Sequence, residues 1–229
     1  MDILTTSAEL QKIPKLKWYP WIGDKYFDLS PEERILIMGE SHYSLNDPIK
    51  IKHWDTNKEQ TKNVILDLLK DSFTSQTHSR FHKLLFENDT LEARERFYQY
   101  VGFINIVQRA MINYQKNYIE KPRKQDFRDG WEVILSTLKV LRPRYVLCIG
   151  VQAANSFDSI NDSDIESKKL HWFDKINNTY PRKGIIKFKD GHECTFLFLK
   201  HMGRSISYKP WRTHIGENSE ILKIISRMN

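Results

Sequence analysis

Residues 35–44 place the tightest constraint on how this chain can fold. Four apolar residues, Ile35-Leu36-Ile37-Met38, run directly into Gly39, and a polar stretch follows. An uninterrupted apolar run of this length predicts a strand that is buried on both faces. A glycine at its end lets the backbone turn sharply or lie close to a ligand. In open α/β sheets, ligands bind beyond the carboxyl ends of the strands. The polar stretch is therefore a candidate site, and a buried strand that merely ends in a polar loop is the alternative.

Other segments repeat the pattern of an apolar strand next to a helix. Strands are predicted at residues 101–107, 145–150 and 194–199, and Asp190-Gly191 predicts a hairpin that joins the last of these to residues 185–188. Helical spacing of apolar residues occurs between these strands, which favours right-handed crossovers and a mostly parallel sheet. The predicted helices cover residues 61–69, 80–86, 91–100, 131–141 and 217–227.

The remaining segments are polar, and their composition predicts irregular structure. Residues 45–58 are interpreted as a surface loop, residues 112–128 as a surface excursion, and residues 158–182 as a variable loop. The aromatic cluster at residues 17–23 is predicted to form a clasp over the sheet edge. No repeat or linker divides the chain, so we expect a single domain over residues 1–229, with residues 1–34 as a lead-in that packs on the core.

Composition and charge narrow the class of protein. The 229 residues carry a net charge of +7, which favours a polyanionic partner. No apolar run approaches the roughly 18–20 residues that cross a bilayer, and the first residues do not resemble a signal peptide. Cys148 and Cys194 lie in apolar runs and are expected to be buried thiols. We therefore expect a cytoplasmic protein without a membrane contact.

Polar side chains follow three of the predicted strands. Glu40 and His42 follow the first, Asn105 interrupts the second, and His201 follows the last. If these strands are parallel neighbours, the three groups meet at one edge of the sheet. A buried amide such as Asn105 costs a few kcal/mol unless it is hydrogen-bonded, so it suits either a nucleobase edge or a bond to a neighbouring loop. The histidines lack the close spacing of zinc motifs, and no phosphate-binding glycine motif or serine nucleophile elbow occurs, so we expect no metal and no cofactor.

The order of these pieces resembles the uracil-DNA glycosylase superfamily, and most closely a divergent bacterial branch of it. Gly39-Glu40-Ser41-His42-Tyr43 looks like the first motif of that superfamily, and Asn105 stands in the strand whose asparagine reads the excised base. Residues 142–150 with Ala153-Ala154 resemble its proline, strand, glycine and helix segment. His201-Met202-Gly203-Arg204-Ser205 occupies the place of the second motif. The resemblance covers residues 35–215 and implies a three-layer α/β/α fold around a mostly parallel four-stranded sheet.

The resemblance implies a role for each matching residue. Glu40 would position water or stabilise the sugar cation, and His201 would stabilise the departing base. The base pocket would comprise Gly39, Ser41, His42, Tyr43, Phe81 and Asn105, with Phe81 or Tyr43 as the stacking face and Asn105 as the reader. Single- or double-stranded DNA would be bound by a monomer through Arg204, Ser205, Ile206, Ser207, Lys209 and Arg212, with Ile206 or Tyr208 as a wedge.

Two departures from the pattern leave other functions open. Ser41 stands where the best-known members carry the aspartate that orients water, and Met202-Gly203 replaces the Pro-Ser of the second motif. The excised base can therefore be uracil, another deaminated base or a larger modified base. The alternatives are a nucleic-acid-binding relative that has lost the chemistry, and a hydrolase of small nucleosides.

Overall fold

Four parallel strands form the centre of the sheet. The computed structural model describes residues 3–70, 75–114, 119–203 and 207–228. Strand β2 (Ile35–Gly39) is fully buried and lies between β4 (Val101–Asn105) and β6 (Tyr145–Ile149). Strand β9 (Glu193–Leu199) pairs with β6, and all three of these pairings are parallel. The register sets Gly39 opposite Asn105, so β2 and β4 have their carboxyl ends at the same level of the sheet.

Three antiparallel strands extend this centre on both sides. The order of the sheet is β1-β4-β2-β6-β9-β8-β7, in which β1 (Trp21–Ile22), β8 (Arg182–Phe188) and β7 (Ile165–Trp172) are antiparallel to their neighbours. The sheet therefore has seven strands, rather than the four that the sequence predicted. The predicted hairpin at residues 185–199 is confirmed as the β8–β9 pair.

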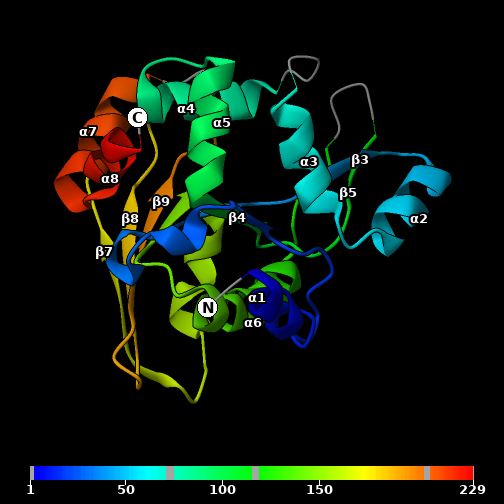
Figure 1. The fold of residues 1–229 in the computed structure, drawn as a ribbon, viewed down its shortest axis with the longest axis horizontal. Helices are drawn as coiled ribbons and strands as arrows, with labels where there is room; N and C mark the ends of the chain where they lie inside the picture. The colour runs from blue at the N-terminus through cyan, green and yellow to red at the C-terminus, as the bar shows by residue number, and fades with distance from the viewer. Residues whose placement is uncertain (1–2, 71–74, 115–118, 204–206, 229) are drawn as a thin grey trace.

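Helices cover both faces of the sheet, as Figure 1 shows. Alternating residues of β2 serve the two faces, because Leu36 and Met38 join one core while Ile35 and Ile37 join the other. The first core is closed by α1 (Ile3–Leu10), α6 (Lys124–Leu141) and the 3-10 helix η3 (Gln152–Ser159). The second is closed by α3 (Gln60–Leu68), α4 (Gln76–Phe86), α5 (Leu91–Tyr100), α7 (Tyr208–Asn218) and α8 (Ile221–Arg227).

Two segments that were expected to be loops form regular structure. Helix α2 (Pro48–Thr56) begins at Asp47, whose side chain accepts hydrogen bonds from the backbone of Ile49 and Lys50. None of its residues is buried, so its sequence lacks the apolar stripe from which a surface helix is predicted. Strand β7 lies at the sheet edge, and its polar sequence suits a strand with little buried surface.

Residues 3–34 contact the sheet and its core. Strand β1 pairs with β4 along the sheet edge, and Trp18 is buried. Two 3-10 helices, η1 (Tyr26–Asp28) and η2 (Pro31–Glu33), connect β1 to β2. The short strands β3 (Tyr43–Leu45) and β5 (Met111–Asn113) form a separate parallel pair beyond the main sheet. Within the described ranges, no helix has the length and apolar character needed to cross a membrane.

Candidate active site

A cavity of about 320 Å³ lies at the carboxyl ends of β2, β6 and β9. It brings Glu40 and His201 together, although 161 positions separate them in the sequence. Parallel pairing explains this, because both residues immediately follow strands that end at the same edge of the sheet. The lining residues are Glu40, Tyr43, Gly150, Val151, Gln152, Thr179, Lys200 and His201.

Among the residues that line the cavity, Glu40 has the most strongly shifted pKa. Burial of its carboxyl raises the pKa of Glu40 to about 7. No hydrogen bond or ion pair within the described residues reaches this carboxylate. Its oxygen Oε2 lies 3.4 Å from the position that a Cβ would take at Gly150, where φ is +140°. Glycine at position 150 therefore lets the backbone turn closely around the acid.

His201 presents a hydrogen-bond donor to the same cavity. Its Nδ1 accepts a hydrogen bond of 3.0 Å from the backbone N–H of Gly203. The neutral ring therefore carries its proton on Nε2. Part of the residue reaches solvent, yet burial of the ring lowers the pKa of His201, which favours this neutral form at pH 7.

Tyr43 forms a wall of the cavity. Burial raises the pKa of its phenol, and the carboxylate of Glu40 adds to the effect. The side chain is still 36% exposed, so one part of the ring remains accessible at the cavity. Of the two residues expected to stack on a base, Tyr43 is the one that the structure places in the pocket.

Asn105 lies opposite Gly39, at the end of the neighbouring strand β4. It is only 4% exposed and is not among the lining residues. Its Oδ1 lies 2.1 Å from where a Cβ at position 39 would stand, so glycine is required there to make room for the amide. Gln108 donates to the carbonyl oxygen of Asn105 at 2.6 Å and accepts from the backbone N–H of Lys17, which ties the lead-in to this strand end.

Two predicted pocket residues belong instead to the core. His42 is buried, its Nε2 lies 3.0 Å from Thr61 Oγ1, and Trp18 packs edge-on against its ring at 5.1 Å. Burial lowers the pKa of His42 to about 4, so it is a neutral packing residue. Phe81 is fully buried among the aromatic residues of α4 and α5 and cannot stack on a base. Ser41, between Glu40 and His42, is half-buried and does not line the cavity.

The predicted DNA contacts divide into three groups. Arg204, Ser205 and Ile206 lie outside the described residues. Ser207 and Lys209 are exposed at the start of α7, as a phosphate contact requires. Arg212 is different, because its guanidinium donates to the carbonyl oxygens of Leu84 and Leu85 at the end of α4. Arg212 thus holds two helices together rather than facing a ligand.

Five lining residues were not anticipated: Gly150, Val151, Gln152, Thr179 and Lys200. Gly150 carried a signal, since it ends an apolar strand as Gly39 does. Lys200 directly precedes His201 and donates to the carbonyl oxygen of Asn177 at 3.3 Å. Thr179 comes from a turn between β7 and β8 within the segment that the sequence presents as a loop, and only the fold brings it here.

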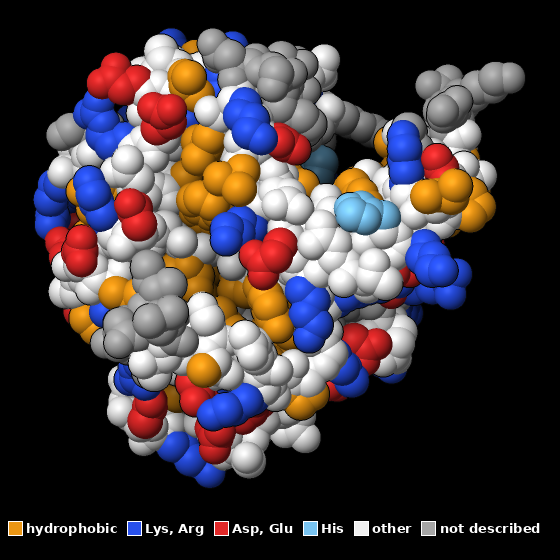
Figure 2. Space-filling view, turned by 45° about the vertical axis from the view of Figure 1, so that its right-hand side comes forward, with side chains coloured by type: hydrophobic (Ala, Val, Ile, Leu, Met, Phe, Trp, Pro, Cys, Tyr) orange, Lys and Arg blue, Asp and Glu red, His pale blue; other side chains and the backbone are white. Residues whose placement is uncertain are grey.

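A larger cavity lies elsewhere in the molecule. It measures about 830 Å³ and is formed by α1, β1, α3 and α5, with Trp21 and Tyr98 in its walls. Figure 2 shows hydrophobic side chains gathered in hollows between mixed acidic and basic groups on one face of the molecule. The cavity lined by Glu40 is the better candidate for an active site, because it lies at the carboxyl ends of the strands and the pKa of Glu40 is raised there. Within the described residues, no three His, Cys, Asp or Glu side chains lie close enough to hold a metal ion.

Comparison with known proteins identifies no family, so a functional assignment depends on the geometry of the site. The sequence matches no model of a known protein family, and no curated protein matches it either.

Proposed function

We propose that this protein is a DNA glycosylase, which hydrolyses the N-glycosidic bond of an extruded base, with a fold of the uracil-DNA glycosylase type. One observation carries the proposal: a half-buried carboxylate, Glu40, and a neutral imidazole donor, His201, line the same cavity. Breaking an N-glycosidic bond builds positive charge on the sugar and negative charge on the departing base. The two groups match these two charges.

Glu40 serves the sugar side of the reaction. As a carboxylate, it stabilises the developing sugar cation or orients the attacking water. Because its pKa is about 7, the active, ionised form becomes dominant only above neutral pH. Excision is therefore expected to increase as the pH rises from 6 to 8.

His201 serves the base side of the reaction. Its Nε2–H is directed by the hydrogen bond that Gly203 makes to Nδ1, so the donor is oriented before a substrate arrives. Tyr43 supplies a flat surface beside the base. Gly39 does not line the cavity, and it makes room for the buried amide of Asn105. The exposed Ser207 and Lys209 are proposed to contact the DNA backbone.

The excision assay tests this proposal directly. The protein is incubated with oligonucleotides that contain uracil, hypoxanthine, xanthine or hydroxymethylcytosine, and abasic sites are scored after alkali. We expect excision of at least one base, and a loss of about 10²-fold or more in Glu40→Gln and in His201→Ala. Glu92→Gln is the matched control, because the Glu92 side chain is 79% exposed on α5.

Three outcomes would contradict the proposal or its site assignment in different ways. Salt-dependent DNA binding without any abasic product would favour a binding protein that has lost the chemistry. Release of free base from nucleosides but not from oligonucleotides would favour a nucleoside hydrolase. If an excised base is found and both variants cleave like the parent, the site is wrongly assigned.

A further inference from the structure

The β7–β8 hairpin reaches the candidate active site through its tip. The strands pair from Ile165 opposite Phe188 at one end to Trp172 opposite Arg182 at the other. Beyond this last pair, Ile176 and Thr179 close the tip, and Thr179 lines the Glu40 cavity. Figure 1 shows the hairpin along the edge of the sheet that lies opposite the pair β3–β5. A surface at this end of the hairpin therefore borders the cavity.

That surface carries two exposed aromatic rings. Trp172 is 57% exposed and Tyr180 is 46% exposed. Their centroids lie 6.2 Å apart and their planes are inclined at 70°, so each ring offers a stacking face of its own. The other tryptophans of the chain are buried or half-buried. The guanidinium of Arg182 lies 3.8 Å from the Trp172 ring and donates to the carbonyl oxygen of Val151 in the cavity wall. Arg182 thus fixes the Trp172 ring beside the pocket.

The same end of the hairpin is basic. Residues 171–183, at this end, contain Lys175, Arg182 and Lys183 and one acidic residue, Asp174. The other acidic residue of the hairpin, Glu166, pairs with Lys187 away from the tip. Lys175 Nζ lies over the Tyr180 ring, 5.0 Å from its centroid. Lys200 lines the cavity that this end of the hairpin borders. Positive charge therefore accompanies the exposed rings, as contact with a polyanion requires.

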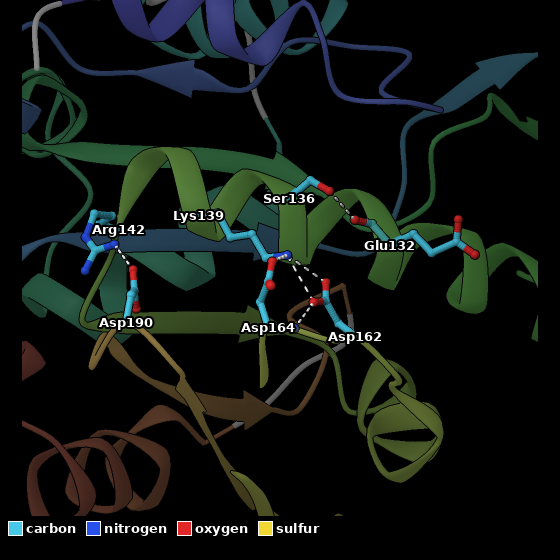
Figure 3. Close-up of polar contacts among 7 residues, drawn as sticks. All are labelled: Glu132, Ser136, Lys139, Arg142, Asp162, Asp164 and Asp190. Carbon is cyan, nitrogen blue, oxygen red and sulfur yellow. Dashed lines mark hydrogen bonds and ion pairs between the residues drawn. The ribbon is translucent and has the colours of Figure 1, made fainter. Parts of the chain in front are cut away.

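Ion pairs anchor the opposite end of the hairpin to the body of the protein. Lys139 of α6 binds Asp162 and Asp164 just before β7, and Arg142 binds Asp190 just after β8 (Figure 3). These acidic groups are thereby neutralised at the base of the hairpin, far along the strands from Trp172. The hairpin is held at its base and presents its aromatic and basic end beside the cavity.

We propose that Trp172 and Tyr180 form a stacking platform for unpaired nucleotides, so that the substrate is single-stranded DNA or a locally unpaired stretch. Aromatic side chains bind single strands because every base offers a flat face, whereas the bases of a duplex are already stacked on each other. The neighbouring nucleotides would stack on the platform while the target base occupies the cavity. This inference rests on the proposed DNA substrate.

Binding to an oligonucleotide without an excisable base tests the platform separately from the chemistry. The anisotropy of a labelled 12-mer of thymidylate is measured with the full chain, alongside a duplex of the same length. We expect tighter binding of the single strand, a loss of about tenfold in Trp172→Ala, and a larger loss when Tyr180→Ala is added. Binding is also expected to quench tryptophan fluorescence, and this quenching should disappear in Trp172→Phe.

The controls separate stacking from folding. Trp172→Phe retains a ring and should bind the 12-mer nearly as tightly as the parent, and Tyr114→Ala removes an exposed aromatic outside the hairpin and should change nothing. Thermal unfolding of each variant shows whether the fold is intact. Equal binding by Trp172→Ala/Tyr180→Ala and the parent, or a preference for the duplex, would overturn the platform. If the 12-mer binds as expected but no base is excised, the glycosylase proposal fails and the platform remains.

Discussion

The Glu40 cavity and the polar cluster beneath α4 both bury ionisable groups, but they stabilise them differently. In the cluster, each group meets a protein partner: Asp89 lies 2.9 Å from His82 Nδ1, His82 Nε2 lies 3.4 Å from the Tyr98 hydroxyl, and that hydroxyl lies 3.3 Å from His78 Nδ1. In the cavity, burial raises the pKa of Glu40 without a compensating partner in the described residues. A polar group that the protein itself satisfies is typically structural, whereas an uncompensated one is kept at a cost in stability and suggests a role in chemistry.

The largest effect expected from this comparison is the loss of stability in His82→Ala. His82 is fully buried, and its removal takes one partner from Asp89 and one from the Tyr98 hydroxyl and creates a cavity. We expect the free energy of unfolding to fall by about 3 kcal/mol, as measured by urea denaturation at pH 7.5. His53→Ala is the control, because His53 is exposed on α2 and should cost little. A His82→Ala variant as stable as the parent would show that the cluster is not structural.

Glu40→Gln should change stability in the opposite direction. Because the pKa of Glu40 is raised in the folded state, from 4.5 to about 7, the folded protein binds the proton more tightly than the unfolded chain between these values. Stability attributable to this group is therefore full below pH 4.5 and is lost as the pH rises to 7. The glutamine variant lacks this loss, so it should be about 2 kcal/mol more stable than the parent at pH 8.

The comparison of the two proteins at low pH completes this test. At pH 4.5 Glu40 is protonated in the folded parent, so the difference between the parent and Glu40→Gln should vanish. Denaturation curves at both pH values, with Glu92→Gln alongside, measure the difference. A glutamine variant that is less stable than the parent at pH 8 would mean that Glu40 has a stabilising partner and resembles the His82 cluster after all.

The strands at the centre of the sheet could be predicted because they are buried on both faces. Strands β2 and β6 are apolar throughout, and such a sequence predicts burial on both faces of the sheet. Strand β7 lies at an edge with polar residues, and nothing in its composition distinguishes it from a loop. The loop-like segment that contains β7 also holds Trp172 and Thr179, so neither could be assigned to a site from sequence.

The side chains at the strand ends were predictable as a group but not one by one. Glu40 and His42 are two residues apart, yet one enters the cavity and the other packs against Trp18. The path of the chain after Gly39 decides this, and the sequence does not state that path. Phe81 and Arg212 were misassigned for a related reason, because aromatic and basic residues serve a core or a helix end as readily as a ligand.

The smallest effect concerns how His201 is held, and it separates positioning from folding. A Cβ at position 203 would lie 2.8 Å from Cε1 and 2.9 Å from Nδ1 of His201, so Gly203→Ala should turn the ring and weaken the hydrogen bond to Nδ1. Excision is expected to fall about tenfold, because a misplaced donor stabilises the departing base less well. The midpoint of thermal unfolding should hardly change, since Gly203 is exposed. Gly216→Ala, in α7, where a Cβ would lie at an ordinary contact distance of 3.5 Å from Leu222, is the control for a glycine outside the site. Unchanged excision in Gly203→Ala would show that the His201 ring needs no fixed orientation, and the Glu40 cavity would then lack the preorganised donor that distinguishes it from the His82 cluster.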